Sequence, residues 1–160
     1  QRVLLGAQGL SASAPMTRPT RRSWPRLMKS WEAPPWGDPA HPTRIYVKPL
    51  LAAMEAADVK AVSHITGGGF YENIPRMMKE GLTAKVEKAK VPVLPIFELI
   101  QKTGNIPERD MYNTFNMGVG MCVAVSKDTA QAAVKAFQAA GEEAVLLGEV
   151  VEGSEGVVLW

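Results

Sequence analysis

Apolar and polar positions follow different periods along the chain, and each period predicts one kind of element. Between residues 42 and 57, apolar residues recur at steps of three and four, which is the pattern of an amphipathic helix. Pro42 suits the first turn of that helix, whereas Pro49 should kink it or begin a second helix. Residues 59–65 are mostly apolar and predict a strand, which leads directly into three consecutive glycines.

The chain beyond the glycines continues to alternate between helical and strand patterns. We expect a short helix over residues 72–79, interrupted at Pro75, and a half-exposed strand over residues 83–88. The later expected elements are helices over 96–102 and 107–112, a strand over 115–125, a helix over 129–140, and strands over 144–151 and 156–159. This order predicts an α/β sandwich in which helices flank a mixed sheet.

The first 41 residues show neither period. They are rich in proline, arginine, serine and tryptophan, and no acidic residue occurs among the first 30. We therefore expect residues 1–41 to be an irregular head, either aberrant or flexible, and residues 42–160 to be the folded domain. A basic head of this kind is compatible with a nucleic-acid-binding arm, a transit peptide or an unstructured remnant, and composition does not rank these.

Composition sets few further limits. A length of 160 residues suits one domain, and 18 basic residues nearly balance 16 acidic ones. The single cysteine, Cys122, excludes an internal disulfide. It lies within an apolar run, so we expect a buried, inert thiol rather than a nucleophile. No apolar stretch approaches the ~20 residues that span a bilayer, and we expect a cytoplasmic protein.

The glycine triplet carries the most informative chemistry. A strand, a glycine loop and a helix start present bare backbone N–H groups to an anion, and glycine lets a phosphate approach where a Cβ would block it. His64, Asn73 and Arg76 flank this loop and would add two neutral hydrogen-bonding groups and one positive charge. The alternative is a tight turn without a ligand. Asn73 could equally cap the loop, and Arg76 could form a salt bridge with a partner domain.

Three stretches of the sequence resemble one known family, in the same order along the chain. They are PTRIYVKPL at residues 42–50, HITGGGFYENIPR at residues 64–76 and MYNTFNMGVGM at residues 111–121. Together they are similar to the signature of phosphoribosylformylglycinamidine cyclo-ligase, also called aminoimidazole ribonucleotide synthetase. The resemblance covers only the C-terminal domain of that family and implies a distantly ferredoxin-like fold.

The head departs from the family pattern. The family has a linker containing serine, glycine, histidine and asparagine near its active site, and only Gly9-Leu10-Ser11 resembles it here. One hypothesis is that residues 12–36 are a shifted-frame translation of that linker. Sequencing the coding DNA tests it: an alternative frame that encodes the linker pattern supports the hypothesis, and its absence refutes it.

The resemblance implies a reaction and a set of site residues. Formylglycinamidine ribonucleotide and ATP would give aminoimidazole ribonucleotide, ADP and phosphate in purine biosynthesis. ATP and magnesium would be held mainly by an N-terminal domain, and the full-length enzyme would be a homodimer. His64 would be the catalytic residue, able to act as acid or base near neutral pH. Substrate or its phosphate would be bound by Thr43, Arg44, Thr66, Gly67, Gly68, Gly69, Asn73 and Arg76.

Other interpretations remain open at this point. The chain also resembles, less well, other ATP-using members of the superfamily, namely selenophosphate synthetase, thiamine-monophosphate kinase and the hydrogenase maturation dehydratase. A non-catalytic phosphate-binding module is a further alternative. The sequence contains no Walker-type Gly-Lys-Thr, no cluster of metal ligands and no serine–histidine–aspartate arrangement. We expect neither a metal site in this chain nor a nucleic-acid partner.

Overall fold

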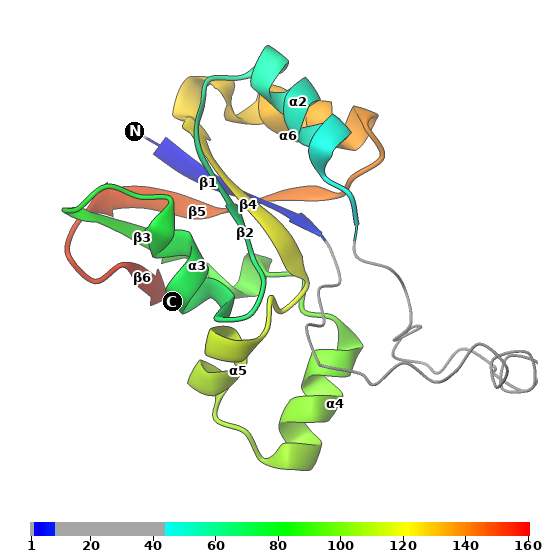
Figure 1. Cartoon of the computed structure of the whole chain (residues 1–160), viewed down its shortest axis with the longest axis vertical. Coiled ribbons are helices and arrows are strands. Elements are labelled where there is room, and N and C mark those ends of the chain that lie inside the picture. Colours follow the sequence, from blue (N-terminus) through cyan, green and yellow to red (C-terminus); the bar gives the residue numbers. More distant parts are fainter. Residues whose placement is uncertain (1, 9–43) are drawn as a thin grey trace, which may run out of the picture.

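A mixed six-stranded sheet forms the centre of the protein, as seen in a computed structural model that describes residues 2–8 and 44–160 (Figure 1). The strands lie in the order β2-β4-β1-β5-β3-β6, and every neighbouring pair is antiparallel except β3 and β6, which are parallel. This confirms the predicted fold class. The strands are β1 (Arg2–Gln8), β2 (Val59–His64), β3 (Leu82–Val86), β4 (Val119–Ser126), β5 (Ala144–Glu152) and β6 (Val157–Leu159).

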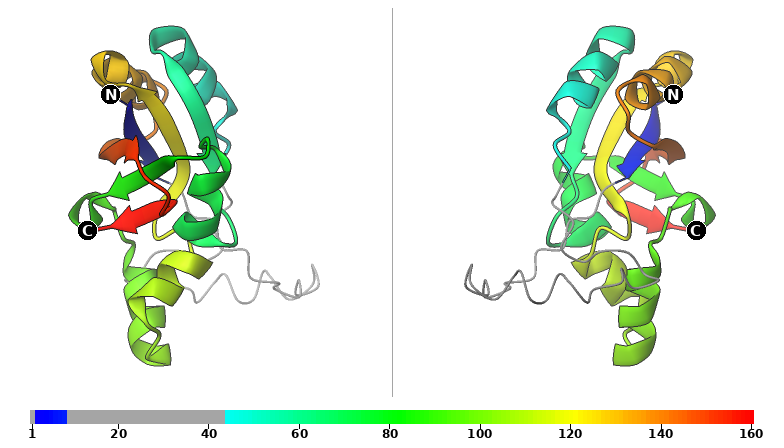
Figure 2. Two further views of the ribbon diagram at one scale, coloured as in Figure 1. Left: turned by 90° about the vertical axis from the view of Figure 1, so that its left-hand side faces the viewer. Right: turned by 90° about the vertical axis from the view of Figure 1, so that its right-hand side faces the viewer.

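Helices cover both faces of this sheet. They are α2 (Val47–Ala56), α3 (Gly69–Arg76), α4 (Pro95–Gly104), α5 (Glu108–Thr114) and α6 (Ala130–Ala139), with short 3-10 turns at Lys88–Lys90 and Lys127–Thr129. Helices α2 and α6 lie together on one side, whereas α3, α4 and α5 lie on the other (Figures 1 and 2). Strand β4 is therefore buried along almost its whole length, as expected for a strand covered on both faces.

Two hydrophobic clusters match the two faces. In β1, Val3, Leu5 and Ala7 pack in the cluster beneath α2 and α6, and Leu4 packs in the larger cluster beneath α3, α4 and α5. This alternation is the period of two that a β-strand imposes on its side chains. Phe137 of α6 and Phe70 of α3 are among the largest fully buried side chains, one in each cluster.

The expectation of an irregular head over residues 1–41 is wrong for its first residues. Residues 2–8 form β1, which pairs with both β4 and β5 near the middle of the sheet. Its sequence, RVLLGAQ, lacks the polar alternation of a half-exposed strand because both of its faces are covered. The folded domain therefore includes a strand on the far side of residues 9–43, which lie outside the described residues.

Helix boundaries also differ from the expected ones. Helix α2 begins at Val47, so Pro49 lies in its first turn, where a missing N–H leaves no intrahelical bond unmade and no kink arises. Helix α3 begins at the third glycine, Gly69, and contains Pro75 one residue before its end. Strand β4 begins at Val119 rather than at residue 115, because the chain turns through positive φ at Met117 and Gly118.

Candidate functional site

The glycine loop joins the edge strand β2 to helix α3, as the sequence predicts. The backbone N–H of Ile65 donates to the carbonyl of Gly120 at 2.8 Å, which continues the β2–β4 pairing by one residue. The N–H of Gly69 then donates to the carbonyl of Thr66 at 3.1 Å and closes a turn. The loop is thus anchored to the buried strand β4 at one end and to α3 at the other.

Two of the three glycines have conformations that favour glycine. Gly68 has φ 93° and Gly69 has φ 53°, both in the left-handed region. A Cβ on Gly69 would lie 2.0 Å from the backbone oxygen of Tyr112, so α3 and α5 approach each other more closely than any side chain allows. A Cβ on Gly68 would meet the side chain of Glu72, both at its carboxylate and at its Cβ, but no backbone atom among the three nearest. Gly69 is therefore required by packing as well as by backbone conformation.

Asn73 fixes the shape of the loop. Its side chain is only 5% exposed, and its Nδ2 group donates to the carbonyls of Gly69 at 2.8 Å, Gly67 at 3.1 Å and Thr66 at 3.4 Å. Its own backbone carbonyl accepts from the hydroxyl of Ser63 at 2.8 Å. The amide turns the loop carbonyls toward the protein. The structure thus shows Asn73 in the loop-capping role.

Arg76 is tied to the same helix. Its Nη1 donates to the Asn73 Oδ1 at 3.3 Å, and its Nη2 lies 3.3 Å from the Glu72 carboxylate in an exposed i,i+4 ion pair. Such pairs are weak, on the order of 0.3–0.5 kcal/mol, so the guanidinium is held near the loop without being committed to its partner. Its positive charge therefore lies close to the glycine loop.

Two loop amides are available to a ligand. Because Asn73 draws the carbonyls inward, the opposite side of the loop presents N–H groups, and those of Gly67 and Gly68 donate to no other described residue. They precede the first turn of α3, where the helix dipole adds a partial positive charge. The loop therefore offers both the N–H donors and the partial positive charge that favour anion binding.

His64 stands at the end of β2, exposed and next to the loop. Its ring makes an edge-to-face contact with Tyr46, with ring centroids 6.1 Å apart. Burial is the main reason that the pKa of Tyr46 is raised, to about 12, so its phenol stays neutral. Tyr46 was not predicted as a site residue. The sequence offered one indication that Tyr46 belongs to the site, namely its place in the motif at residues 42–50.

Arg44 does not point to the loop in this structure. Its Nη1 lies 2.7 Å from a carboxylate oxygen of Glu142, just after α6, and this hydrogen bond is the main cause that raises the Arg44 pKa. The structure therefore brings together His64, Thr66, the three glycines, Asn73 and Arg76, but not Arg44. Thr43 lies outside the described residues.

The turn before β4 supports the loop from the other side. Asn116 is fully buried, and its Oδ1 accepts from the N–H of Gly118 at 3.1 Å. Its carbonyl accepts from Val119 at 2.8 Å. The asparagine thus fixes the start of the strand to which the glycine loop is anchored.

Cys122 is buried in β4, as predicted for an inert thiol. Burial raises its pKa to about 12, so the neutral thiol persists throughout the physiological range. We expect a maleimide at pH 8 to leave the native chain unlabelled and to label one site in urea. Mass spectrometry before and after unfolding checks this, and rapid labelling of the native chain would contradict it.

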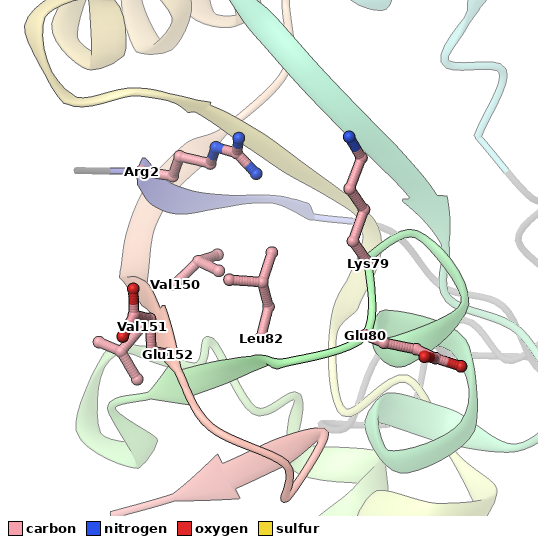
Figure 3. Close-up of a pocket in the computed structure, with 7 residues that line it drawn as sticks. All are labelled: Arg2, Lys79, Glu80, Leu82, Val150, Val151 and Glu152. Carbon is pink, nitrogen blue, oxygen red and sulfur yellow. The ribbon is translucent and has the colours of Figure 1, made fainter.

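A cavity of about 570 Å³ lies at the other end of the sheet. It is lined by Arg2, Lys79, Glu80, Leu82, Val150, Val151 and Glu152. In Figure 3 the side chain of Arg2 extends toward that of Lys79, above Leu82 and Val150. Arg2 pairs with the last residue of β4, whereas the glycine loop adjoins the first residues of that strand. The cavity is therefore separate from the loop and contains none of the predicted site residues.

Two classes of site are not found in the described part of the chain. Among residues 2–8 and 44–160, no group of three or more histidine, cysteine, aspartate or glutamate side chains is placed to hold a metal ion. Within the same ranges, no helix combines the length and apolar character that a membrane crossing requires.

A glycine loop held by an asparagine, between an edge strand and a short helix of an α/β sandwich, matches a known class of domain. Residues 4–160 match the family described as AIR synthase related protein, C-terminal domain, and the chain belongs to that family. The match begins within β1, which agrees with the place of that strand in the sheet.

Curated relatives within the family are named phosphoribosylformylglycinamidine cyclo-ligase. The protein from Lachnoclostridium phytofermentans is 53% identical over 119 residues, which cover 74% of this chain and 35% of the relative. Its counterpart from Acetivibrio thermocellus is 51% identical over 116 residues, covering 72% of this chain and 34% of the relative. The chain thus matches about a third of the length of these relatives.

Solved structures show the same fold at lower identity. Escherichia coli HypE, a hydrogenase maturation protein, superposes with a TM-score of 0.66 at 20% identity, over 99% of this chain and 46% of that one. A chain of a HypE–HypF complex superposes with a TM-score of 0.63 at 21% identity, over 99% of this chain and 48% of that one. At this identity the likeness shows the fold alone.

Proposed function

We propose that this chain is the substrate-side domain of an ATP-dependent cyclo-ligase, which converts formylglycinamidine ribonucleotide to aminoimidazole ribonucleotide in de novo purine biosynthesis. The observation that carries the proposal is the glycine loop. It combines two N–H groups without partners among the described residues with a nearby arginine, in a chain about 50% identical to cyclo-ligases. These features suit the 5′-phosphate of a ribonucleotide.

The chemistry assigns separate tasks to the site residues. In the proposed reaction the γ-phosphoryl group of ATP is transferred to the formamide oxygen of the substrate, giving ADP. An amidine nitrogen then attacks the activated carbon, the ring closes and phosphate leaves. Such a sequence asks the protein mainly to position the reactants and to neutralise charge. The loop would hold the 5′-phosphate with Arg76, and the exposed imidazole of His64 would hydrogen-bond the oxygen that is phosphorylated.

We propose that Asn73 positions the loop and does not itself contact the ligand. Its side chain already donates to three loop carbonyls and accepts from Arg76. We assign it as a positioning residue that keeps the amides of Gly67 and Gly68 facing outward. Thr66, whose carbonyl belongs to the same network, would support the loop from its other end.

ATP and magnesium belong to another part of the proposed enzyme. The described residues offer no set of carboxylates that would hold a divalent cation, so magnesium and the nucleotide would be bound mainly by an N-terminal domain of the same protein. We further propose that the full-length enzyme is a cytoplasmic homodimer. This chain alone should therefore not turn over. Sustained ATP-dependent ring closure by the purified chain would show that the ATP site is wrongly assigned.

Calorimetric titration tests the substrate assignment directly. Formylglycinamidine ribonucleotide is titrated into the purified chain, and the nucleoside that lacks the 5′-phosphate serves as the matched control. We expect the ribonucleotide to bind and the nucleoside to bind at least roughly tenfold more weakly, because the loop amides and Arg76 act on the phosphate. Equal binding of the two, or no binding of either, would overturn the assignment.

A further inference from the structure

Helix α2 has an apolar face that no described residue covers. Three large apolar side chains on it are exposed, Val47 at 60%, Leu51 at 55% and Met54 at 49%, and Ile45, two residues before the helix begins, is 79% exposed. Val47, Leu51 and Met54 follow one another at steps of four and three, so they lie along one side of the helix. The opposite side is buried, with Ala53 in the cluster shared with α6. We call the four exposed residues the α2 stripe.

The α2 stripe is exceptional on this surface. Among the described residues only three other large apolar side chains are exposed: Leu99 on α4, Leu146 on β5 and Trp160 after the end of β6. A row of apolar side chains on one helix face is typical of an interaction surface, whereas scattered ones are ordinary. The stripe therefore requires a partner that the described chain does not supply.

The stripe also borders the candidate site. Tyr46 stands between Ile45 and Val47 in the sequence, and its ring contacts His64 at the end of β2. Strand β2 is the edge of the sheet, so its outer side is paired with no other described strand. A partner seated on the stripe would thus reach the glycine loop and His64 from the open edge.

The candidate site has too little positive charge of its own to balance the proposed reactants. Near the loop the guanidinium of Arg76 already faces the carboxylate of Glu72, and that of Arg109 lies over the ring of Tyr71 on the same helix. Two phosphate-bearing reactants would bring several negative charges to this place. The groups that balance them must come from a surface brought close to the loop, and the α2 stripe provides the place where such a surface can be fixed.

We propose that the α2 stripe is the docking surface for the ATP-binding part of the family's polypeptide; this rests on the proposed function. The choice of occupant follows from length. Relatives of this chain match it over only 34–35% of their own length, so about twice as much polypeptide accompanies the domain in those proteins. Apolar burial on α2 holds the two parts together and leaves the polar loop free for substrate.

Cysteine accessibility tests the docking surface without depending on activity. Leu51→Cys and, as the matched control, Leu99→Cys are made in this chain and in a chimera in which its matching stretch replaces that of the Lachnoclostridium phytofermentans cyclo-ligase. The buried Cys122 does not interfere. We expect maleimide labelling at Leu51→Cys to be at least roughly tenfold slower in the chimera than in the chain alone, and labelling at Leu99→Cys to change less than about twofold.

Other outcomes overturn the proposal. Equal labelling of Leu51→Cys in the two proteins would show that the stripe stays open. Slower labelling of the isolated chain at higher protein concentration would identify a second copy as the occupant. If the chimera shows no cooperative unfolding transition, the tagged chain is co-expressed with the remainder of the relative. The wild type and Leu99→Asp should then capture it, and the Leu51→Asp, Met54→Asp double variant should not. Any other pattern contradicts the assignment.

Failure of the docking surface and failure of the proposed function are distinguishable. Ribonucleotide binding to the isolated chain does not involve the stripe, so Leu51→Cys should keep wild-type substrate affinity there. Loss of substrate binding with intact protection at Leu51→Cys would reject the substrate and keep the interface. Retained substrate binding without protection at Leu51→Cys would reject the interface and keep the substrate.

Discussion

Gly69→Ala is expected to destabilise the domain by about 2–5 kcal/mol. The new Cβ would lie 2.0 Å from the backbone oxygen of Tyr112, and relief of that clash requires α3 and α5 to move apart. The residue would also be held at φ 53°, which costs an L-amino acid about 1–2 kcal/mol. Overpacking against main-chain atoms accounts for the remainder. Urea unfolding followed by circular dichroism measures the change.

Gly81→Ala is the matched control for that experiment. Gly81 has φ 80°, also in the left-handed region, but a Cβ there would meet no atom within 4 Å. The free energy of unfolding of this variant should fall only by the cost of the left-handed backbone conformation, about 1–2 kcal/mol. A similar loss in the two variants would contradict the close approach of α3 and α5, on which the position of the loop depends.

Asn73→Asp is expected to disrupt both the fold around the loop and the binding of the ribonucleotide. The substitution replaces the buried donor by a carboxylate oxygen that faces the carbonyls of Thr66, Gly67 and Gly69. A buried group left without its partners costs roughly 2–4 kcal/mol, and charge raises that cost. A negative charge beneath the anion site should also weaken ribonucleotide binding at least roughly tenfold. Urea unfolding and calorimetry measure the two effects.

Asn113→Asp provides the comparison for the asparagine. Asn113 is exposed on α5, so the same chemical change there should alter the free energy of unfolding by no more than about 0.5 kcal/mol and leave substrate affinity unchanged. Wild-type stability of Asn73→Asp would show that the three loop hydrogen bonds do not determine the shape of the site.

The sequence predicts the fold best where one periodic pattern coincides with one element. The strand before the glycines and helix α6 lie within one residue of their expected bounds, and the observed sheet is mixed as expected. Strand β1 was missed because its seven residues are covered on both faces and carry no alternation, and because residues 9–41 beside them show no regular pattern. Its pairing with β4 and β5 spans more than a hundred residues and leaves no local signal.

For the site residues too, what can be predicted depends on whether a contact is local or distant in the sequence. The grouping of His64, the glycines, Asn73 and Arg76 is predictable, because these residues lie within 13 positions of one another in the sequence. The ion pair of Arg44 with Glu142 joins residues 98 positions apart, and nothing near Arg44 indicates it. The requirement for Gly69 likewise comes from Tyr112 on another helix. Spacing indicates that a loop exists there, whereas packing determines which glycine is irreplaceable.

The amide resonances of the glycine loop give the most direct test of the central claim. The chain is labelled with ¹⁵N-glycine, and formylglycinamidine ribonucleotide is added while the glycine N–H signals are followed. We predict that the signals of Gly67 and Gly68 shift in a saturable manner, because their N–H groups receive the phosphate, while those of Gly81, just before β3, and Gly141, shortly after α6, stay in place. Unmoved signals of Gly67 and Gly68 at saturating ribonucleotide would contradict the account.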